Sequence, residues 1–581
     1  MIFGIIMQWI YRHSETLIVV AALLLFLPGL GQTHLFDWDE INFAESAREM
    51  LLTGNWWQVS IDFHPFWEKP PLFIALQALS MSIFGVNEMA ARLPNAITGV
   101  LTLMLLYRIG QFIYDKKFAI LFPLIYLATL APHVYFKSGL IDPLFNLLIY
   151  AGIYSLFRIN IAEPQKRNRY VLRAGLLIGA AVLTKGPVAL LIILLTTVPL
   201  WAIRRKSIHF SGREVFFFLA MLLLVSLPWY VAVTIKNGLW FPLEFIRYQI
   251  ALAGADNTAH TQPFYYHFLV LLLACFPFSA FLFARFRKQA SSGLQKVLQF
   301  RWWNWTLLAV VLLVFSIVKT KIIHYSSLAW FPIIFLVAEY IYLNIWSKGG
   351  AKAPTAVRFL YLFLLFLWTG AVFIFLYIAR HADKIIPYIK DPFVVETLEI
   401  KLFWPLILAL PAFILLLGGI VFYKYWSQNR LANGLPYLLI ASILFIQSTL
   451  YTFAPRIEKY TQGAAIEFYR KIAPQKKYVE VLGFKSYAHL FYARKKEEDN
   501  SSPLFLKYLE RIRTEKNLPA NWPDARQFNS VYREWLLEGD IDRTAYFVAK
   551  VPSYKMWKDR YGLEEIGRKG GFVFLKRSAS R

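Results

Sequence analysis

Cysteine is almost missing from this sequence: among 581 residues the only one is Cys275, inside an apolar run. A single thiol cannot form a disulfide within the chain, so a disulfide-stapled fold is excluded and cysteine usage does not indicate the redox compartment. The sequence also has no internal repeat, low-complexity tract or heptad array, which argues against a repeat array or a coiled coil.

Charge is scarce as well, and acidic residues most of all. Charged residues make up 17% of the chain, with 36 acids against 62 bases and a net charge of +26. In contrast, 57% of the residues are hydrophobic and the mean hydropathy is +0.46, which predicts a polytopic membrane protein. The net charge could indicate nucleic-acid binding, but much of it lies in short loops, where Lys and Arg fix topology. We therefore expect the lipid bilayer, and no nucleic acid, as a partner.

Apolar runs of the length that crosses a bilayer predict a mainly α fold with about thirteen transmembrane helices. We interpret the short segment 71–84, which begins at a Pro-Pro pair, as an interfacial helix. The expected spans are residues 15–31, 92–112, 118–133, 140–157, 171–184, 187–202, 214–234, 263–284, 303–318, 325–345, 357–379, 402–423 and 435–453.

Lys and Arg separate cleanly between alternate loops of this arrangement. By the positive-inside rule, the basic side is cytoplasmic and holds the N-terminus, and an odd number of spans places the C-terminal segment outside. The basic loops include Lys116, Arg167, Arg205, Lys288, Lys348 and Lys424.

The composition predicts two domains. Residues 1–454 form the transmembrane domain, whose first outer loop spans residues 32–91, and residues 455–581 form a small outer-face α/β domain of ordinary domain size. In the second domain we expect strands at 477–484, 544–551 and 571–576, a polar loop at 497–502 and a helix at 553–561.

The scarce acids concentrate in residues 36–72, which also carry four tryptophans and lie between two apolar regions. Charges beside a membrane are costly unless they bind something, so this stretch is the expected functional site. Seven of the 36 acids fall here: Asp37, Asp39, Glu40, Glu45, Glu49, Asp62 and Glu68.

Two acids stand at predicted helix starts that face the outer side. Asp39 precedes an amphipathic interfacial helix over 41–52, and Asp142 begins a span. Each carboxylate could simply cap its helix, which on spacing alone is as good an explanation as a catalytic role. A pair of carboxylates in one outer pocket could instead bind an acceptor and take its proton.

The sequence WEKPP is the most specific local signal, because Pro70 and Pro71 fix an extended backbone that directs Glu68 and Lys69 away from the following helix. Lys69 could snorkel at the membrane surface or hold a lipid phosphate. His260 with Glu68 could bind a divalent metal such as Zn, Mg or Mn, although no HxxxH or HxH spacing supports it and a structural histidine is an alternative. A second outer basic cluster contains Lys319, Lys321, His324 and Tyr325.

Several of these motifs, in this order over about residues 35–335, resemble the GT-C membrane glycosyltransferases, in the protein O-mannosyltransferase-like branch that includes lipid A aminoarabinose transferases. The matching pieces are WDEINFAESAREMLLTGNWW, FWEKPPLF, FGVNEMAARLPNA, KSGLIDPLF, LTKGPVALL, HTQPFYYHFLVLLLACFPFS and KTKIIHYSSLAWFP. The resemblance implies an inverting enzyme of the bacterial inner membrane that moves a sugar from a polyprenyl-phosphate donor to an acceptor on the outer face.

The resemblance also implies roles for individual residues. Asp39 corresponds to the essential acid and Asp142 to a second one, and we include the adjacent Glu40 among the catalytic candidates. Lys69 is expected at the donor phosphate, and Glu68 at a metal site found in some members. The remaining correspondences are Lys321 and Tyr325 to the family's later Lys and Tyr, and His260 to its metal-site His.

One departure concerns Asn42-Phe43, where aminoarabinose transferases carry Arg-Tyr. It leaves the sugar and the acceptor open: lipid A, another glycolipid, a glycan or a protein. A transporter or flippase of lipid-linked sugars is the alternative function, although its charges would usually lie near the bilayer midplane and not at one face. We expect a monomer.

Overall fold

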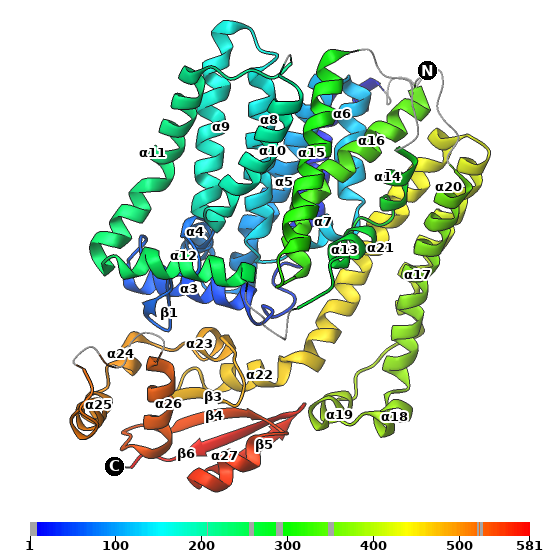
Figure 1. Cartoon of the computed structure of the whole chain (residues 1–581). Helices are drawn as coiled ribbons and strands as arrows, with labels where there is room; N and C mark the ends of the chain where they lie inside the picture. The colour runs from blue at the N-terminus through cyan, green and yellow to red at the C-terminus, as the bar shows by residue number, and fades with distance from the viewer. Residues whose placement is uncertain are drawn as a thin grey trace.

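A computed structural model describes residues 8–205, 207–254, 261–285, 294–346, 354–519, 522 and 527–580 of the chain. Three layers follow one another in Figure 1: a bundle of long helices, a thin layer of helices and loops across one end of the bundle, and a small α/β domain beneath that layer.

Helix is present in each of the thirteen expected spans. By length and composition, seven of the described helices could cross a membrane, so the fold class is confirmed while the number thirteen stays a prediction. The bundle contains α2 (Ser14–Phe26), α5 (Glu88–Ile113), α6 (Lys116–Leu127), α7 (Leu130–Tyr135), α8 (Asp142–Ile159), α9 (Pro164–Lys185), α10 (Val188–Ile203), α11 (Gly212–Asn237), α13 (Tyr266–Ala274), α14 (Ser279–Arg285), α15 (Gln295–Ile317), η1 (Ile323–Ala329), α16 (Trp330–Trp346), α17 (Thr355–Arg380), η3 (Leu406–Ala409), α20 (Leu410–Ser427) and α21 (Leu431–Thr461).

Local sequence signals explain where several of these helices begin. The side chain of Asn87 accepts a hydrogen bond from the Ala90 amide at the start of α5, and Asp115 does the same for Phe118 at the start of α6. Short polar side chains satisfy amide groups that a first helical turn leaves free. These caps therefore fix the chain where it enters the bundle.

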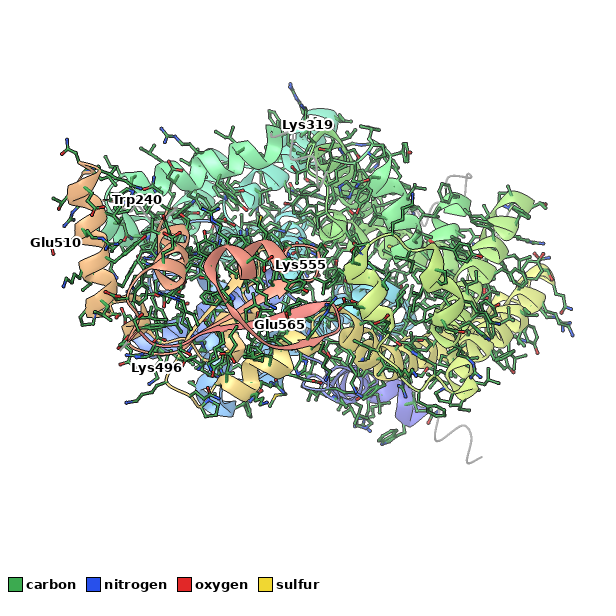
Figure 2. The ribbon with its side chains drawn as sticks, turned by 90° about the horizontal axis from the view of Figure 1, so that it is seen from below. Trp240, Lys319, Lys496, Glu510, Lys555 and Glu565 are labelled. Carbon is green, nitrogen blue, oxygen red and sulfur yellow. The ribbon has the colours of Figure 1, made fainter. Side chains whose placement is uncertain are left out.

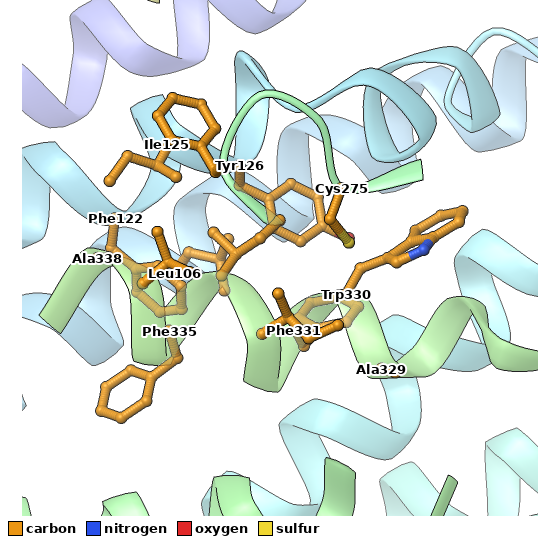
Figure 3. Packing of buried hydrophobic residues seen from close by; sticks show 14 of the residues in the cluster. Leu106, Phe122, Ile125, Tyr126, Cys275, Ala329, Trp330, Phe331, Phe335 and Ala338 are labelled. Atoms are coloured by element: carbon orange, nitrogen blue, oxygen red, sulfur yellow. The ribbon is translucent and has the colours of Figure 1, made fainter. Parts of the chain in front are cut away.

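Aromatic side chains interlock in the middle of the bundle (Figure 3). Ring centroids of Tyr126 and Phe331 lie 5.2 Å apart, and those of Phe122 and Phe335 lie 5.7 Å apart. The lone Cys275 is buried beside them. Because lipid tails are as apolar as these side chains, close packing and not water exclusion holds such helices together in a membrane.

The middle layer contains α3 (Asp39–Thr53), the two-residue strands β1 (Ser60–Ile61) and β2 (His64–Pro65), α4 (Leu72–Phe84) and α12 (Trp240–Gly254). Residues 40–50 of α3 are all buried, so the helix expected to lie at the membrane interface is enclosed by protein on every side. The segment 235–262, expected to be a loop, contains α12, which lies across the end of the bundle in Figure 1.

The C-terminal domain is a four-stranded sheet in the order β3-β4-β6-β5, with β3 parallel to β4 and the other pairs antiparallel. The three expected strands are confirmed, whereas the expected loop at 497–502 contains the short helix α24. The elements are α22 (Gly463–Ile472), β3 (Tyr478–Leu482), α23 (Ala488–Tyr492), α24 (Glu497–Asn500), α25 (Pro503–Glu515), α26 (Phe528–Glu538), β4 (Ala545–Lys550), α27 (Tyr554–Tyr561), β5 (Glu564–Lys569) and β6 (Phe572–Arg577).

The C-terminal domain joins the bundle through a continuous helix, because α21 runs on to Thr461 past the expected end of the last span at residue 453. The segment before it adds α18 (Ala382–Ile385), η2 (Ile386–Tyr388) and α19 (Pro392–Leu398). Seen from below, the red and orange domain covers one part of the bundle, while yellow-green helices extend beyond it at the right (Figure 2). The domain therefore covers the middle layer, which holds four of the eight expected site residues: Asp39, Glu40, Glu68 and Lys69.

Candidate functional site

Asp39 stands at the first position of α3, directly after the N-cap residue Trp38. Its side chain is 42% exposed, and its Oδ2 lies 3.6 Å from Nε2 of His324 in η1. At the positive end of a helix a carboxylate is stabilised by the helix dipole. Asp39 is thus a carboxylate that a ligand can reach, with an imidazole beside it.

Asp142 is in a different environment, although it also begins a helix. Its side chain is 4% exposed, and Oδ1 accepts a hydrogen bond from Lys185 Nζ at 2.5 Å. The Lys185 ammonium also lies 5.3 Å from the ring centroid of Tyr325. Asp142 therefore holds a lysine from the end of α9 next to a tyrosine from η1.

His324 links the two acids. Its ring lies within electrostatic range of Asp142 and Lys69 as well as of Asp39. The ring also meets that of Tyr325 edge to face, with centroids 5.3 Å apart. The starts of α3 and α8 therefore meet at η1.

Glu40 is buried and its two oxygens are fully engaged. Arg92 donates to both of them, at 2.8 and 2.9 Å, and the amide groups of Gly139 and Phe36 donate as well. Arg92 also donates to three carbonyl oxygens of residues 30–34. A buried, bidentate pair of this kind fixes geometry. In this structure Glu40 ties the start of α3 to α5 and to the loop before α8.

Glu68 and Lys69 are half-buried and face α12. Nζ of Lys69 lies 5.5 Å from the ring centroid of Tyr248, and Tyr248 also shares a hydrogen bond with Glu68. Burial, followed by the charge of Glu68, raises the pKa of Tyr248, so this phenol stays protonated and can donate. Lys69 has no carboxylate partner among the described residues.

Two further expected site residues, Lys321 and His260, are not seen to contact Asp39, Asp142 or Lys69 among the described residues. Lys321 is buried, donates to the Val318 carbonyl at 2.7 Å and lies near His267. His260 lies outside the described residues. Over the described part of the chain, no three His, Cys, Asp or Glu side chains lie close enough together to hold a metal ion. Glu68 therefore has no second and third metal ligand among these residues.

Residues 462–492 hold the segment that leads into Asp39 through three hydrogen bonds. The backbone of Leu35 donates to the Tyr492 hydroxyl at 2.8 Å, and the amide of Asp37 donates to Gln462 at 3.1 Å. The carboxylate of Asp37 in turn accepts from the Tyr487 amide at 3.1 Å. Residues more than 400 positions apart thus set the approach to α3.

A buried ionic network lies further along α3. Glu45 pairs with Arg48 at 2.5 Å, and Asp62 pairs with Lys495 of the C-terminal domain at 2.7 Å, all four side chains being nearly inaccessible. The carboxylate of Glu49 is also buried, and among the described residues it accepts a hydrogen bond only from the Phe63 amide. Burial, followed by the charges of Glu45 and Asp62, raises the pKa of Glu49 well above its ordinary value.

Sequence reasoning left some of these partners unassigned. Lys185 and His324 lie in two of the matching motifs, KGP and KTKIIHY, but the sequence analysis predicts no role for either residue. Tyr248 and Arg92 carried no local signal, because their partners come from distant segments. A pairing across such distances is not visible in one sequence.

Comparisons with known proteins agree with this architecture. Residues 68–231 match the family model described as dolichyl-phosphate-mannose-protein mannosyltransferase. The chain is 27% identical over 339 residues to an undecaprenyl phosphate-alpha-4-amino-4-deoxy-L-arabinose arabinosyl transferase of Pectobacterium carotovorum, covering 57% of this chain and 59% of that protein. A protein of the same name from Enterobacter sp. is 29% identical over 341 residues, with the same coverage. The match thus spans less than two thirds of these relatives.

A solved structure extends the likeness over the whole fold. The crystal structure of ArnT from Cupriavidus metallidurans bound to undecaprenyl phosphate matches with a TM-score of 0.72, covering 97% of this chain and 98% of that chain at 16% identity. At such identity the likeness shows the fold alone. The class is therefore defined: this is a multi-pass membrane protein with the GT-C glycosyltransferase fold.

Within that class, the family match, the curated relatives and the shared fold confirm the expected resemblance. The chain is similar in sequence to the aminoarabinose transferases and, over residues 68–231, to the protein mannosyltransferase family model.

Proposed function

We propose that the chain is a glycosyltransferase that moves a sugar from a polyprenyl-phosphate donor to an acceptor at the outer face of the inner membrane. The observation that carries this proposal is the meeting of an exposed carboxylate, Asp39, with cations from two other segments, Lys69 and Lys185, at one end of the bundle. An inverting transfer needs a group that orients or deprotonates the acceptor and positive charge for the departing phosphate.

Asp39 is the acid that acts on the acceptor, since it is the more exposed of the two. Its Oδ2 accepts the acceptor proton as the new glycosidic bond forms and the bond from the anomeric carbon to the phosphate oxygen breaks. His324, 3.6 Å away, orients that carboxylate. Asp142 acts through Lys185, and Glu40 through Arg92, as positioning residues.

Lys69 neutralises the phosphate of the departing polyprenyl phosphate. Its ammonium is held over Tyr248 and has no acid partner among the described side chains, so it can bind an anion without breaking an existing pair. The single O–H of Tyr248 is shared with Glu68, so Tyr248 offers Lys69 its ring face. Tyr325 and Lys185 lie toward the same centre, whereas Lys321 donates to the Val318 carbonyl and has no role in this proposal.

The relatives are named for undecaprenyl phosphate and 4-amino-4-deoxy-L-arabinose, so undecaprenyl phosphate is the proposed lipid carrier. The sugar need not be 4-amino-4-deoxy-L-arabinose, because this chain differs from the aminoarabinose transferases at residues 42 and 43. Phe43, one of the two residues that replace Arg-Tyr, is buried and packs edge to face on Phe73, and Asn42 is buried beside it. Neither residue offers a charge to a bound sugar.

A transfer assay separates this proposal from a lipid-linked sugar flippase. Purified protein in detergent is given radiolabelled polyprenyl-phosphate sugar and an extract of outer-face glycolipids, and free polyprenyl phosphate is measured. A transferase releases it together with a new labelled glycolipid, whereas a flippase returns the donor intact. Intact donor with wild-type protein, under conditions where it binds, contradicts the proposal. The glycan profile of a strain that lacks the protein identifies the acceptor.

A further inference from the structure

Arg158, in the last turn of α8, is a cation held among aromatic rings. Helix α8 begins at Asp142 in the candidate site, so Arg158 lies at the other end of the bundle, away from the C-terminal domain (Figure 1). Its guanidinium carbon lies 3.8 Å from the ring centroid of Phe112 in α5 and 4.7 Å from that of Tyr170 in α9. It also donates to the hydroxyls of Tyr154 and Tyr170. Three helices thus meet at one positive charge.

A second cation lies over the same ring. Nζ of Lys296, in the first turn of α15, lies 5.1 Å from the Phe112 centroid and donates to the Phe112 carbonyl. Nε of Arg158 is buried, and among the described residues it has no hydrogen-bond partner. Two cations beside one ring repel each other, and the repulsion is stronger where protein and lipid replace water. An anion bound next to both charges relieves this repulsion.

The described part of the chain supplies no such anion, because no carboxylate in it pairs with Arg158 or Lys296. The acids at this end of the bundle are engaged elsewhere: Glu15 with Arg108, Asp115 with Tyr342, Glu163 with Lys166, Glu214 with Arg167 and Glu339 with Arg301. Residue 206 and residues 286–293, which lie outside the described residues, include no Asp or Glu. The anion that fits between these cations therefore comes from outside the chain.

Tryptophan side chains mark the depth of this end in the membrane. Trp201, near the end of α10, and Trp302 of α15 are both exposed. The guanidinium carbon of Arg204, which directly follows α10, lies 4.1 Å from the Trp302 ring centroid. Tryptophan is enriched at the depth of lipid headgroups, and Lys and Arg at the cytoplasmic side. The helix ends that carry the two cations therefore lie near the lipid phosphates.

Helix α9 adds a surface for the rest of a lipid. Arg173 is exposed and lies within electrostatic range of Tyr154, one of the two phenols that bind Arg158. Its neighbours Leu172 and Leu176 on the same helix are exposed as well. Cations next to exposed leucines match a molecule with an anionic head and apolar tails.

We infer that Arg158 and Lys296 form a binding site for an acidic phospholipid, whose phosphate lies against the two cations. The site is separate from the proposed reaction centre, because it lies at the opposite end of α8 from Asp142. The expected orientation places it in the cytoplasmic leaflet, where basic pockets between transmembrane helices bind anionic headgroups.

The chemistry of the pocket selects an acidic headgroup over a zwitterionic one. The hydroxyls of Tyr154 and Tyr170 accept from Arg158 and keep their own protons, so each can donate to a phosphate oxygen. The ammonium of Lys296 adds a charge-assisted hydrogen bond. A choline headgroup would bring a third cation beside these two, whereas glycerol brings none.

Native mass spectrometry of the full-length protein in detergent tests this site, with phosphatidylglycerol and phosphatidylcholine of the same acyl chains as probes. Wild type should bind the first phosphatidylglycerol about thirtyfold more tightly than phosphatidylcholine, because two cations face its phosphate. Lys296→Gln should weaken phosphatidylglycerol binding about tenfold, the loss of one charge-assisted hydrogen bond. Lys296→Arg keeps the charge and should keep most of the affinity. Lys296 carries the test because Arg158 also joins three helices.

Lys166→Gln is the matched control, since Lys166 is an exposed lysine at the same end of the bundle and pairs with Glu163. It should bind phosphatidylglycerol as wild type does. Phosphatidylcholine binding should be unchanged in all three variants, which reports that the fold is intact. Equal affinity of wild type for the two lipids, or equal effects of Lys296→Gln and Lys166→Gln, overturns the site.

Inorganic phosphate, added in large excess, separates a lipid from a free anion. It lacks the acyl chains that pack on α9, so it should leave phosphatidylglycerol bound. Displacement of the lipid by inorganic phosphate would show that the two cations bind free anions, and it would overturn the assignment to a phospholipid.

Discussion

Lys185 Nζ lies 2.5 Å from Asp142 Oδ1, and this pair joins the last residue of α9 to the first residue of α8. Both side chains are largely buried, so each charge depends on the other. Removing one partner of a buried pair leaves an uncompensated charge and costs about 3–5 kcal/mol, whereas removing both often costs little.

We therefore expect Asp142→Asn and Lys185→Met each to lower the midpoint of thermal unfolding, and the double variant to recover most of that loss. The transfer rate should be at least tenfold below that of wild type in all three variants. In each of them Lys185 is either absent or no longer held beside Tyr325 by Asp142. Scanning fluorimetry and the transfer assay measure the two effects. Full activity in the double variant would show that the pair serves stability only.

Asp39→Asn should abolish transfer while the protein still folds and inserts. Asn keeps a side chain of the same size at the first position of α3 but loses the negative charge that takes the acceptor proton. Asp391→Asn is the control for removing a carboxylate at a helix start, since Asp391 accepts from the Phe393 amide before α19. The assay is donor turnover at saturating donor. Near-normal turnover of Asp39→Asn would remove the Asp39 charge from the transfer reaction.

Lys69→Ala should raise the donor concentration needed for half-saturation and slow transfer together, about tenfold to a hundredfold in total, the worth of a charge-assisted hydrogen bond. Lys69→Arg should recover part of the loss, since a planar fork replaces a compact charge over Tyr248. Lys384→Ala, at an exposed position on α18, is the control. A lysine that merely snorkels predicts unchanged kinetics for both variants.

Stability should fall as pH rises, because of Glu49. Burial and neighbouring acids raise the pKa of Glu49, so the folded state keeps a proton that the unfolded chain releases above about pH 4.3. The unfolding midpoint of wild type should therefore drop from pH 5 towards higher pH, and Glu49→Gln should flatten that slope. Glu498→Gln, at an exposed carboxylate, should keep the wild-type slope. Equal slopes in wild type and Glu49→Gln would contradict this assignment.

Reporter fusions test the orientation. Fusions after Arg169 and Lys424 should report cytoplasm, and a fusion after Ser580 should report the outer face, because Lys and Arg concentrate in loops of the first kind. An outer-face signal at Arg169 would reverse the whole arrangement.

Much of the fold could be predicted because apolar runs and strand patterns are local. The elements that were not predicted have polar or mixed composition. Strand β5 (EEIGRK) is an edge strand without an apolar face, and α12 carries the exposed Arg247, which pairs with the half-buried Glu244. The enclosure of α3 also escaped, since its charged face reads as solvent-facing until a second domain covers it.

The site was predictable residue by residue where a motif places a side chain at a helix start, as for Asp39 and Asp142. The partners of these acids could not be predicted. Lys185, His324 and Arg92 are brought to the acids by the fold, across sequence separations too long for local patterns to reveal.

The contacts of residues 462–495 with the segments on either side of α3 have a consequence for the order in which the site can form during synthesis. Residues 35–62 are synthesised early, whereas their partners Gln462, Tyr492 and Lys495 are synthesised late. Until those partners have been made, Asp62 and the backbone of Leu35 lack these contacts. The segment that leads into Asp39 is therefore fixed in place only late in synthesis, and we expect a chain truncated before residue 462 to leave it unfixed.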